Sequence, residues 1–211
     1  MFTIAMRYCL RVLAVALVLS LAALGSSCAR PLLKPPRAEL DLQTLLDNAM
    51  DDGQVEIPFG EYVLDVGLKI KDKSGLKITA QPGARILVND VMEDIIALDN
   101  CQSARIENLY LRHVKPLDEY ECQGACIRAD GCGRVTIVNC ELNGSGAFGV
   151  AASETRDLLV QECFIHHNTY AAIYLYECDG VTVRDNRIVN NAEVLSRLSS
   201  DNVLMENNRL K

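Results

Sequence analysis

Residues 134–188 read RVTIVNCELNGSGAFGVAASETRDLLVQECFIHHNTYAAIYLYECDGVTVRDNRI, and they contain one eight-residue motif three times. The copies are VTIVNCEL at 135–142, LLVQECFI at 158–165 and VTVRDNRI at 181–188, which start 23 residues apart. A fourth copy, VLMENNRL at 203–210, follows after 22 residues, and ARIENLYL at 104–111 is a looser relative. Repeats at a fixed period of this size indicate a solenoid, in which each unit buries its apolar face by stacking on its neighbours.

A second motif lies between the copies of the first. It reads IALDNC at 96–101, IRADGC at 127–132, VAASET at 150–155 and IYLYEC at 173–178. Apolar residues at spacing two, rich in Val and Ile and interrupted by Gly, Asn and Asp, indicate short strands and no helix. We therefore expect three strands of about three residues per repeat, which close a triangular coil, with successive coils about 4.8 Å apart.

The V-x-I-x-x-N/C-x-I motif followed by G-V/I-x-L resembles the right-handed parallel β-helix of the pectate-lyase-like group, over residues 40–211. The resemblance implies an all-β, right-handed, single-stranded parallel β-helix of about six to seven short coils, with an N-terminal capping α-helix. It also implies that Cys140, Cys163, Asn186 and Asn208 occupy the bend where that group stacks an asparagine ladder. Because this fold carries lyases, hydrolases, adhesins and non-catalytic proteins, the resemblance implies little about function.

The first 27 residues are predicted to be an export signal. Arg7 and Arg11 precede an apolar run from Val12 to Leu24, which is too short to span a bilayer. The following Gly-Ser-Ser-Cys resembles a bacterial lipoprotein cleavage box, so we expect an exported protein of the periplasm or cell surface that is anchored to the membrane by lipidation of Cys28. Ordinary signal cleavage, with Cys28 as a free thiol, is the alternative.

The remaining chain is predicted to consist of a Pro-rich tether at 28–39 and one β-helix domain at 40–211. Leu40 to Met50 has a helical apolar pattern, and we expect this helix to cover the exposed edges of the first coil. Residues 202–211 form a repeat copy without a polar cap. A frayed last coil, end-to-end contact with another subunit, and a truncated piece of a larger adhesin or enzyme are three interpretations that stay open.

The composition and net charge of the chain argue against some classes of binding partner. The net charge is −7, aromatic residues make up 5% of the chain, and no basic patch stands out, so we expect no nucleic-acid binding. The same charge argues against polyanionic glycans unless a cation bridges them.

Nine cysteines in a chain predicted to be exported raise the question of disulfides. Cys101 and Cys132 share one column on adjacent coils, and Cys140 and Cys163 share another, at a spacing that permits a disulfide. We favour the interpretation that these thiols simply fill tight inward corners. The better disulfide candidate is Cys122 with Cys126, on a loop. No zinc site is expected, because none of the three histidines has ligand spacing to a cysteine pair.

Strand alternation places Arg128 and Asp130, and later Tyr174 and Tyr176, on one outward face. The resemblance implies that this sheet, with its flanking loops, is where polysaccharide-processing β-helices hold substrate. The tyrosines suit stacking on a sugar ring, although β-propensity alone also explains them. The repeat is longest before Ile127, and long loops on one face of a solenoid are candidate binding sites.

Candidates for catalysis are weak. Asp99 and Asp130 would form a stacked carboxylate pair beside Arg128, in which one acid retains its proton. Such a pair could supply the acid and the nucleophile or base of glycosidic cleavage, or it could instead bind Ca²⁺ with loop oxygens. Ordinary turn chemistry, with Asp before Asn or Gly at a strand end, is the favoured explanation. His113 is a weak candidate base beside the long loop. The acidic residues of that loop are weak candidates for a cation site: Asp118, Glu119 and Glu121.

The sequence therefore favours a non-catalytic binding or scaffolding protein of the cell envelope, with a carbohydrate as ligand on the face that carries Arg128, Asp130, Tyr174 and Tyr176. A small polysaccharide lyase or glycoside hydrolase is the alternative. No cofactor is expected apart from the weak Ca²⁺ hypothesis.

Overall fold

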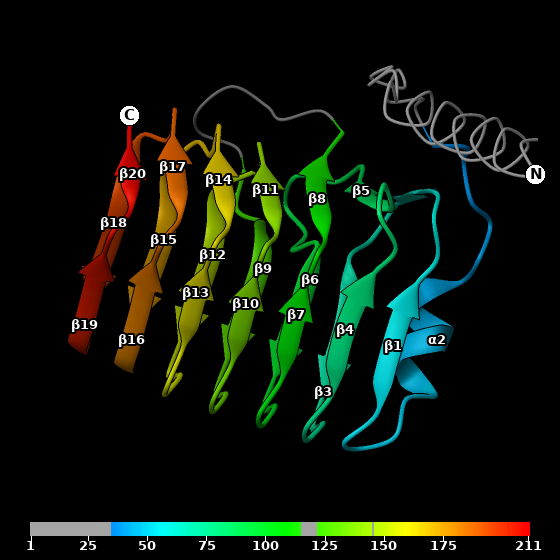
Figure 1. Ribbon diagram of the computed structural model, residues 1–211, viewed down its shortest axis with the longest axis horizontal. Coiled ribbons are helices and arrows are strands. Elements are labelled where there is room, and N and C mark those ends of the chain that lie inside the picture. The colour runs from blue at the N-terminus through cyan, green and yellow to red at the C-terminus, as the bar shows by residue number, and fades with distance from the viewer. Residues whose placement is uncertain (1–34, 115–121, 145) are drawn as a thin grey trace, which may run out of the picture. The chain divides into compact units, whose positions relative to one another are not determined.

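The computed structural model describes residues 35–114, 122–144 and 146–211, and it arranges them as a stack of coils with a short helix at one end (Figure 1). Within these residues each coil contributes strands to three parallel sheets of 7, 7 and 6 strands. The first sheet consists of β1 (Gln54–Ile57), β4 (Lys77–Ala80), β7 (Arg105–Glu107), β10 (Thr136–Val138), β13 (Leu159–Gln161), β16 (Asp179–Arg184) and β19 (Asp201–Glu206). The second consists of β2 (Glu61–Leu64), β5 (Arg85–Val88), β8 (Tyr110–His113), β11 (Glu141–Asn143), β14 (Phe164–His166), β17 (Arg187–Val189) and β20 (Arg209–Leu210). The third consists of β3 (Leu68–Lys71), β6 (Ile96–Asp99), β9 (Ala125–Asp130), β12 (Phe148–Ser153), β15 (Ala171–Tyr176) and β18 (Glu193–Leu198).

The register of the first sheet follows the repeat. Ile137 is paired with Ile106 on one side and with Val160 on the other, and Val160 is paired in turn with Val183. All four are buried. Because inward residues of in-register parallel strands lie above one another, they form one apolar column along the axis. The predicted all-β parallel solenoid is confirmed.

The bends between the third and first sheets need a left-handed backbone. The residue that follows the strand has a positive φ in four successive coils: Asn100 (52°), Gly131 (59°), Glu154 (46°) and Glu177 (51°). Gly and Asn adopt this conformation readily, whereas Glu does so at a cost. Hydrogen bonds between coils, such as Gly131 N to Ser153 O at 3.0 Å, hold the bend in place.

The bend between the first and second sheets carries the asparagine ladder. The side chain of Asn186 accepts a hydrogen bond from the amide of Cys163 at 2.8 Å and donates one to the carbonyl of Val160 at 2.9 Å. Asn208 in turn accepts from the amide of Asn186 at 3.0 Å. In the preceding coils the amide of Cys140 donates to the sulfur of Cys163 at 3.5 Å. The column that the resemblance implied is therefore present.

The N-terminal helix is shorter than the predicted span of 40–50. Helix α2 covers only Leu42–Asp47, and it begins there because Asp41 caps its first turn by accepting from the amide of Thr44 at 3.1 Å. Asn48 closes the other end with a hydrogen bond to the Thr44 carbonyl. Leu42 and Leu46 are buried, so the predicted face does pack on the core.

Two further contacts cover the open edge of the first coil. The amide side chain of Gln43 donates to the carbonyl of Lys69 at 2.8 Å and accepts from its amide at 2.9 Å, where a neighbouring strand would otherwise bond. The amide of Ala38 donates to the carbonyl of Glu61 at 2.9 Å. Ala38, near the end of the predicted tether, therefore pairs with the second sheet.

At the opposite end, β18, β19 and β20 have a strand neighbour on one side only among the described residues. Three apolar side chains of this coil are exposed: Leu198, Leu204 and Leu210. End-to-end contact through this coil stays a prediction. In the described part of the chain, no helix has the length and apolar character needed to cross a membrane.

Candidate functional site

The outward residues of the third sheet lie in two files, as predicted. One file contains Ala97, Arg128, Ala151 and Tyr174, and the other contains Asp99, Asp130, Ser153 and Tyr176. Arg128 and Tyr174 are thus two coils apart, or about 10 Å at the usual strand spacing. The sheet brings together side chains that are far apart in the sequence.

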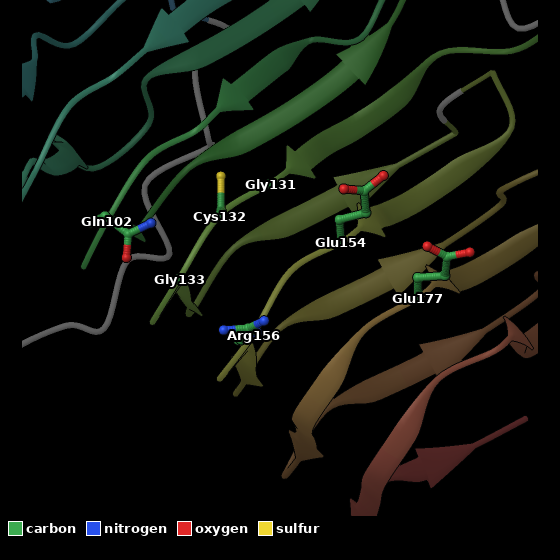
Figure 2. Close-up of a pocket in the computed structure, with 7 residues that line it drawn as sticks. All are labelled: Gln102, Gly131, Cys132, Gly133, Glu154, Arg156 and Glu177. Carbon is green, nitrogen blue, oxygen red and sulfur yellow. The ribbon is translucent and has the colours of Figure 1, made fainter.

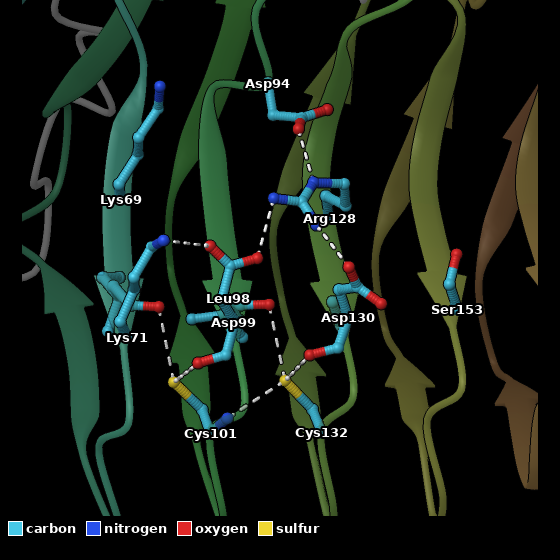
Figure 3. A network of polar contacts seen from close by, with 12 residues as sticks. Lys69, Lys71, Asp94, Leu98, Asp99, Cys101, Arg128, Asp130, Cys132 and Ser153 are labelled. Carbon is cyan, nitrogen blue, oxygen red and sulfur yellow. Dashed lines mark hydrogen bonds and ion pairs between the residues drawn. The ribbon is translucent and has the colours of Figure 1, made fainter.

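Arg128 is the centre of an ion-pair network on this face (Figure 3). Its Nε lies 2.7 Å from Asp94 Oδ2, its Nη2 lies 2.8 Å from Asp99 Oδ1, and its Nη1 lies 3.2 Å from Asp130 Oδ2. Lys71 lies 3.7 Å from the other oxygen of Asp99. Burial by itself would lower the pKa of Arg128, but the bonds to Asp94 and Asp99 outweigh it and raise the pKa.

This network changes the interpretation of the carboxylate pair. Asp99 and Asp130 are neighbours in the register, as predicted, but the guanidinium of Arg128 bonds both of them. The repulsion between the two carboxylates is therefore compensated by a cation. Asp94, from the turn before β6, also accepts from the amide of Ala125 at 2.9 Å. The geometry is that of a structural clamp between coils, which does not supply a free acid and base.

His113 is not at the surface, which corrects its proposed role as a base. The side chain is fully buried, Nδ1 accepts from the amide of Gly146 at 3.0 Å, and Nε2 lies 2.8 Å from the carbonyl of Glu93. Burial lowers the pKa of this imidazole. The side chain therefore ties two turns to the core and has no nitrogen left for a substrate.

An aromatic cleft lies further along the same face. Phe148 stacks on Tyr174 with ring centroids 4.8 Å apart, and its centroid lies 6.0 Å from that of Tyr170. These rings open onto a cleft of about 240 Å³. Its other lining residues come from β15, from β18 and from the residue before β18: Ala171, Ala192, Glu193 and Ser196. We call this site the aromatic cleft.

Tyr176 lies outside the aromatic cleft. Its hydroxyl hydrogen-bonds Glu177, and this bond raises the pKa of Tyr176. Tyr174 and Tyr176 are both outward on β15, but only Tyr174 joins the other rings. Of the two predicted tyrosines, Tyr174 therefore lines the aromatic cleft, whereas Tyr176 lies beside Glu177.

Sequence reasoning missed Phe148 and Tyr170. Phe148 stands two residues before the second motif, opposite Ala171 in the next coil, and Tyr170 directly precedes that alanine. Strand alternation would have placed position 148 on the inward face with Val150 and Ala152, so the second motif did not mark this phenylalanine as an outward residue. The small side chain of Ala171 leaves room for the rings.

A second, more polar cleft of about 510 Å³ lies at the bend after the third sheet (Figure 2). Glu154 and Glu177 project from equivalent positions of neighbouring coils at one side, and Gln102 and Arg156 lie at the other. Between them the cleft is lined by Gly131, Cys132 and Gly133. The space beside Gly131 is open, because a Cβ atom at this position would have no other atom within 4 Å.

The cysteines that the structure describes are all buried free thiols. The predicted Cys122–Cys126 disulfide is therefore wrong for this structure. The sulfur of Cys122 donates to the carbonyl of Gly146 at 2.7 Å, whereas that of Cys126 faces the carbonyl of Leu111 at 3.9 Å. The two thiols therefore face different backbone carbonyls. Among the stacked thiols, the favoured interpretation as inward corner residues agrees with the structure.

Four predicted positions lie outside the described residues: Cys28, Asp118, Glu119 and Glu121. The structure therefore tests neither the lipid anchor nor the acidic loop. Within the described residues, no three His, Cys, Asp or Glu side chains are grouped in a way that could hold a metal ion.

Comparison with known proteins agrees with this geometry. A protein from Parabacteroides merdae that is provisionally described as a glycosyl hydrolase superimposes with a TM-score of 0.60 at 15% identity, over 80% of this chain and 88% of that one. The ORF18 protein of Geobacillus virus E2 superimposes with a TM-score of 0.55 at 11% identity, over 70% of this chain and 33% of that one. At these identities the likeness concerns the fold alone. No curated protein sequence matches the chain.

The coils, the three parallel sheets and the inward ladder define a parallel β-helix protein. A sequence profile described as "right handed beta helix region" matches residues 94–211, which are more than half of the chain. The chain therefore belongs to the right-handed β-helix family.

Proposed function

We propose that this protein binds a neutral carbohydrate in the aromatic cleft without cleaving it. The observation that carries the proposal is the grouping of Phe148, Tyr170 and Tyr174 from two consecutive coils around one opening. Aromatic rings present large apolar faces, which suit the C–H face of a sugar ring. The carboxylate of Glu193 and the hydroxyl of Ser196 line the same opening and supply partners for sugar hydroxyls.

The size and charge of the cleft narrow the range of possible ligands. Its volume of about 240 Å³ is below the roughly 300–1,000 Å³ that is usual for enclosed small-molecule sites. This suits one ring of a chain that continues along the open sheet face. Because the protein carries a net charge of −7 and Glu193 lines the cleft, a neutral glycan is favoured over an acidic one. The provisional description of the Parabacteroides merdae protein as a glycosyl hydrolase agrees with a carbohydrate ligand.

Binding without cleavage is favoured because the acids on the sheet face are engaged. Asp99 and Asp130 both bond the guanidinium of Arg128, so neither is free to protonate a glycosidic oxygen. One observation favours glycoside hydrolysis as a second candidate function. Glu154 and Glu177 stand at equivalent positions of neighbouring coils in the polar cleft, and retaining glycosidases use a pair of carboxyl groups about 5–5.5 Å apart.

The test is calorimetric titration of the purified protein with neutral oligosaccharides, after a glycan array has selected one. We expect Tyr174→Ala to weaken binding by about tenfold or more, which corresponds to a loss of about 1.4 kcal/mol. Tyr176→Ala, on the same strand but outside the cleft, is the matched control and should bind as the unchanged protein does. Equal losses in both variants, or no binding of any neutral glycan, would refute the proposal.

A parallel assay for new reducing or unsaturated ends separates the two functions. The binding proposal predicts no release of ends from a bound oligosaccharide. Release that is abolished by Glu177→Gln and kept by Tyr176→Ala would establish the hydrolase instead.

We also propose that the protein is exported and held at a membrane through Cys28. The basic start and the apolar run before Gly25 support export, and the Gly-Ser-Ser-Cys stretch supports lipidation. Intact-mass measurement of the protein recovered from a bacterial membrane fraction should find a chain that begins at an acylated Cys28. A mature N-terminus at another residue, or an unmodified Cys28, would contradict the anchor.

A further inference from the structure

Two thiols from neighbouring coils meet at the bend after the third sheet. Cys101 follows β6 and Cys132 follows β9, and the register pairs Asp99 with Asp130 just before them (Figure 3). The amide of Cys101 donates to the sulfur of Cys132 at 3.3 Å. In-register neighbours stand about 4.8 Å apart, which lies inside the range of roughly 4.4–6.8 Å between the Cα atoms of a disulfide.

The two thiols shift each other's pKa. A hydrogen bond between the two thiols lowers the pKa of Cys101 to about 7 and raises the pKa of Cys132. Burial opposes this lowering of the Cys101 pKa, and the carboxylates of Asp99 and Asp72 oppose it further. The thiolate is the form that attacks a disulfide.

A small oxidant can approach this pair through the polar cleft. Cys132 lines that cleft, between two glycines that carry no side chain to cover it (Figure 2). Thiol–disulfide exchange requires access as well as a thiolate. Cys101 is fully buried and Cys132 is 3% exposed, so the cleft brings the reagent to the wall that covers the pair, and exchange follows when the bend opens.

We propose that Cys101 and Cys132 form a redox-active dithiol that a small disulfide oxidises in the folded protein. The thiolate of the pair attacks one sulfur of the reagent R–S–S–R, which forms a mixed disulfide and releases R–S⁻. The released thiolate takes the proton of the second thiol. That second sulfur then attacks the protein sulfur of the mixed disulfide and expels another R–S⁻. The protein dithiol is oxidised by two electrons, and the reagent is reduced to two thiols.

The new bond would join two coils across 31 residues of sequence. It would join the bends that follow β6 and β9. Asp99, at the end of β6, forms its ion pair with Arg128 on the outward face of the same sheet. Closing a loop of this length restricts the unfolded chain, so the oxidised protein should unfold at a temperature higher by on the order of 10 °C.

The experiment incubates the native protein with oxidised glutathione, then unfolds it without reductant, alkylates the free thiols and maps the peptides by mass spectrometry. We expect a cross-linked pair of peptides that contain Cys101 and Cys132. Cys178 serves as an internal control, because it stands in the same column with Thr155 and Ser200 as neighbours in place of a thiol. It should remain available for alkylation.

The matched variant is Cys132→Thr. Thr155 occupies the same position one coil later and bonds the carbonyls of Ala129 and Ser153, so threonine suits this bend. The variant should fold, lose the cross-link and lose the rise in unfolding temperature. Cys140→Ser removes a thiol of the other stacked pair and should keep both effects. Alkylation of Cys101 and Cys132 after oxidation, a cross-link formed only in denaturant, or a temperature shift that persists in Cys132→Thr would overturn the proposal.

Discussion

The amide of Gly146 donates a hydrogen bond of 3.0 Å to Nδ1 of His113, across 33 residues of sequence. Because Nδ1 accepts, the proton of the neutral ring is on Nε2, from which it is donated to the carbonyl of Glu93 at 2.8 Å. The imidazole thus joins two turns through their backbones. Protonation would place a second proton on Nδ1, opposite a group that also donates.

This arrangement predicts a loss of stability in mild acid. Burial lowers the pKa of His113 below its ordinary value of 6.5, against the opposing charges of Asp94 and Asp90. Between the folded and unfolded pKa values the unfolded chain binds more protons, so the free energy of unfolding falls as the pH falls below about 6.5. Urea midpoints measured between pH 7.5 and pH 5.5 should decline over this window.

The control variants are His113→Gln and His167→Gln. The first should be less stable at pH 7.5 and should lose part of the decline, whereas the second, at an exposed position, should keep it. A decline of the same size in His113→Gln would show that another group causes it.

Removing the guanidinium at the centre of the ion-pair network should destabilise the fold. Arg128→Leu leaves the carboxylates of Asp94, Asp99 and Asp130 without their shared cation, and we expect a loss of about 1–3 kcal/mol. Denaturant unfolding measures it. Arg134→Leu, which removes a single exposed hydrogen bond to Ser103, should change stability by less than about 0.5 kcal/mol. Equal effects would contradict a structural role for the network.

The asparagine ladder predicts a gradient along the stack. Asn186→Ala leaves the buried amide of Cys163 and the carbonyl of Val160 without partners, at a cost of about 1–3 kcal/mol. Asn208→Ala, in the outermost coil, should cost less because its surroundings are open to water. Thermal unfolding of both variants compares them, and a larger loss at Asn208 would be inconsistent with the ladder described here.

The thiol pair predicts a pH-dependent reaction rate. Because the hydrogen bond from Cys132 lowers the pKa of Cys101 to about 7, oxidation by glutathione disulfide should accelerate as the pH rises through 7 and then level off. Stopped-time alkylation with peptide mapping follows the rate. A rate that still rises steeply between pH 8 and pH 9 would show that the pKa of Cys101 is not lowered, and it would contradict this prediction.

The repeat made most of the fold predictable. The constant spacing of Ile137, Val160 and Val183 determined both the strand positions and their register, because a slip of one residue would have turned these side chains out of the core. The same spacing placed Arg128 near Tyr174. The helix was predicted too long because the side chain of Asp41 caps its first turn and Asn48 closes its last turn.

The site was less predictable because it depends on residues outside the motifs. Asp94 reaches Arg128 from a turn, and Phe148 and Tyr170 precede their motif copies, so no periodic position marked them. His113 was misjudged because its neighbours Glu93 and Gly146 belong to turns whose course over the coil is not encoded by the period. Contacts made by turns over a solenoid depend on each turn's own conformation.

The central claim is that the aromatic cleft holds a neutral glycan. NMR spectra of aromatic and backbone signals, recorded while a neutral oligosaccharide is added, test it most directly. We predict that the signals of Phe148, Tyr170 and Tyr174 shift and saturate together, while those around Arg128 remain in place. Shifts centred on Glu154 and Glu177, or no shift at saturating oligosaccharide, would contradict the account.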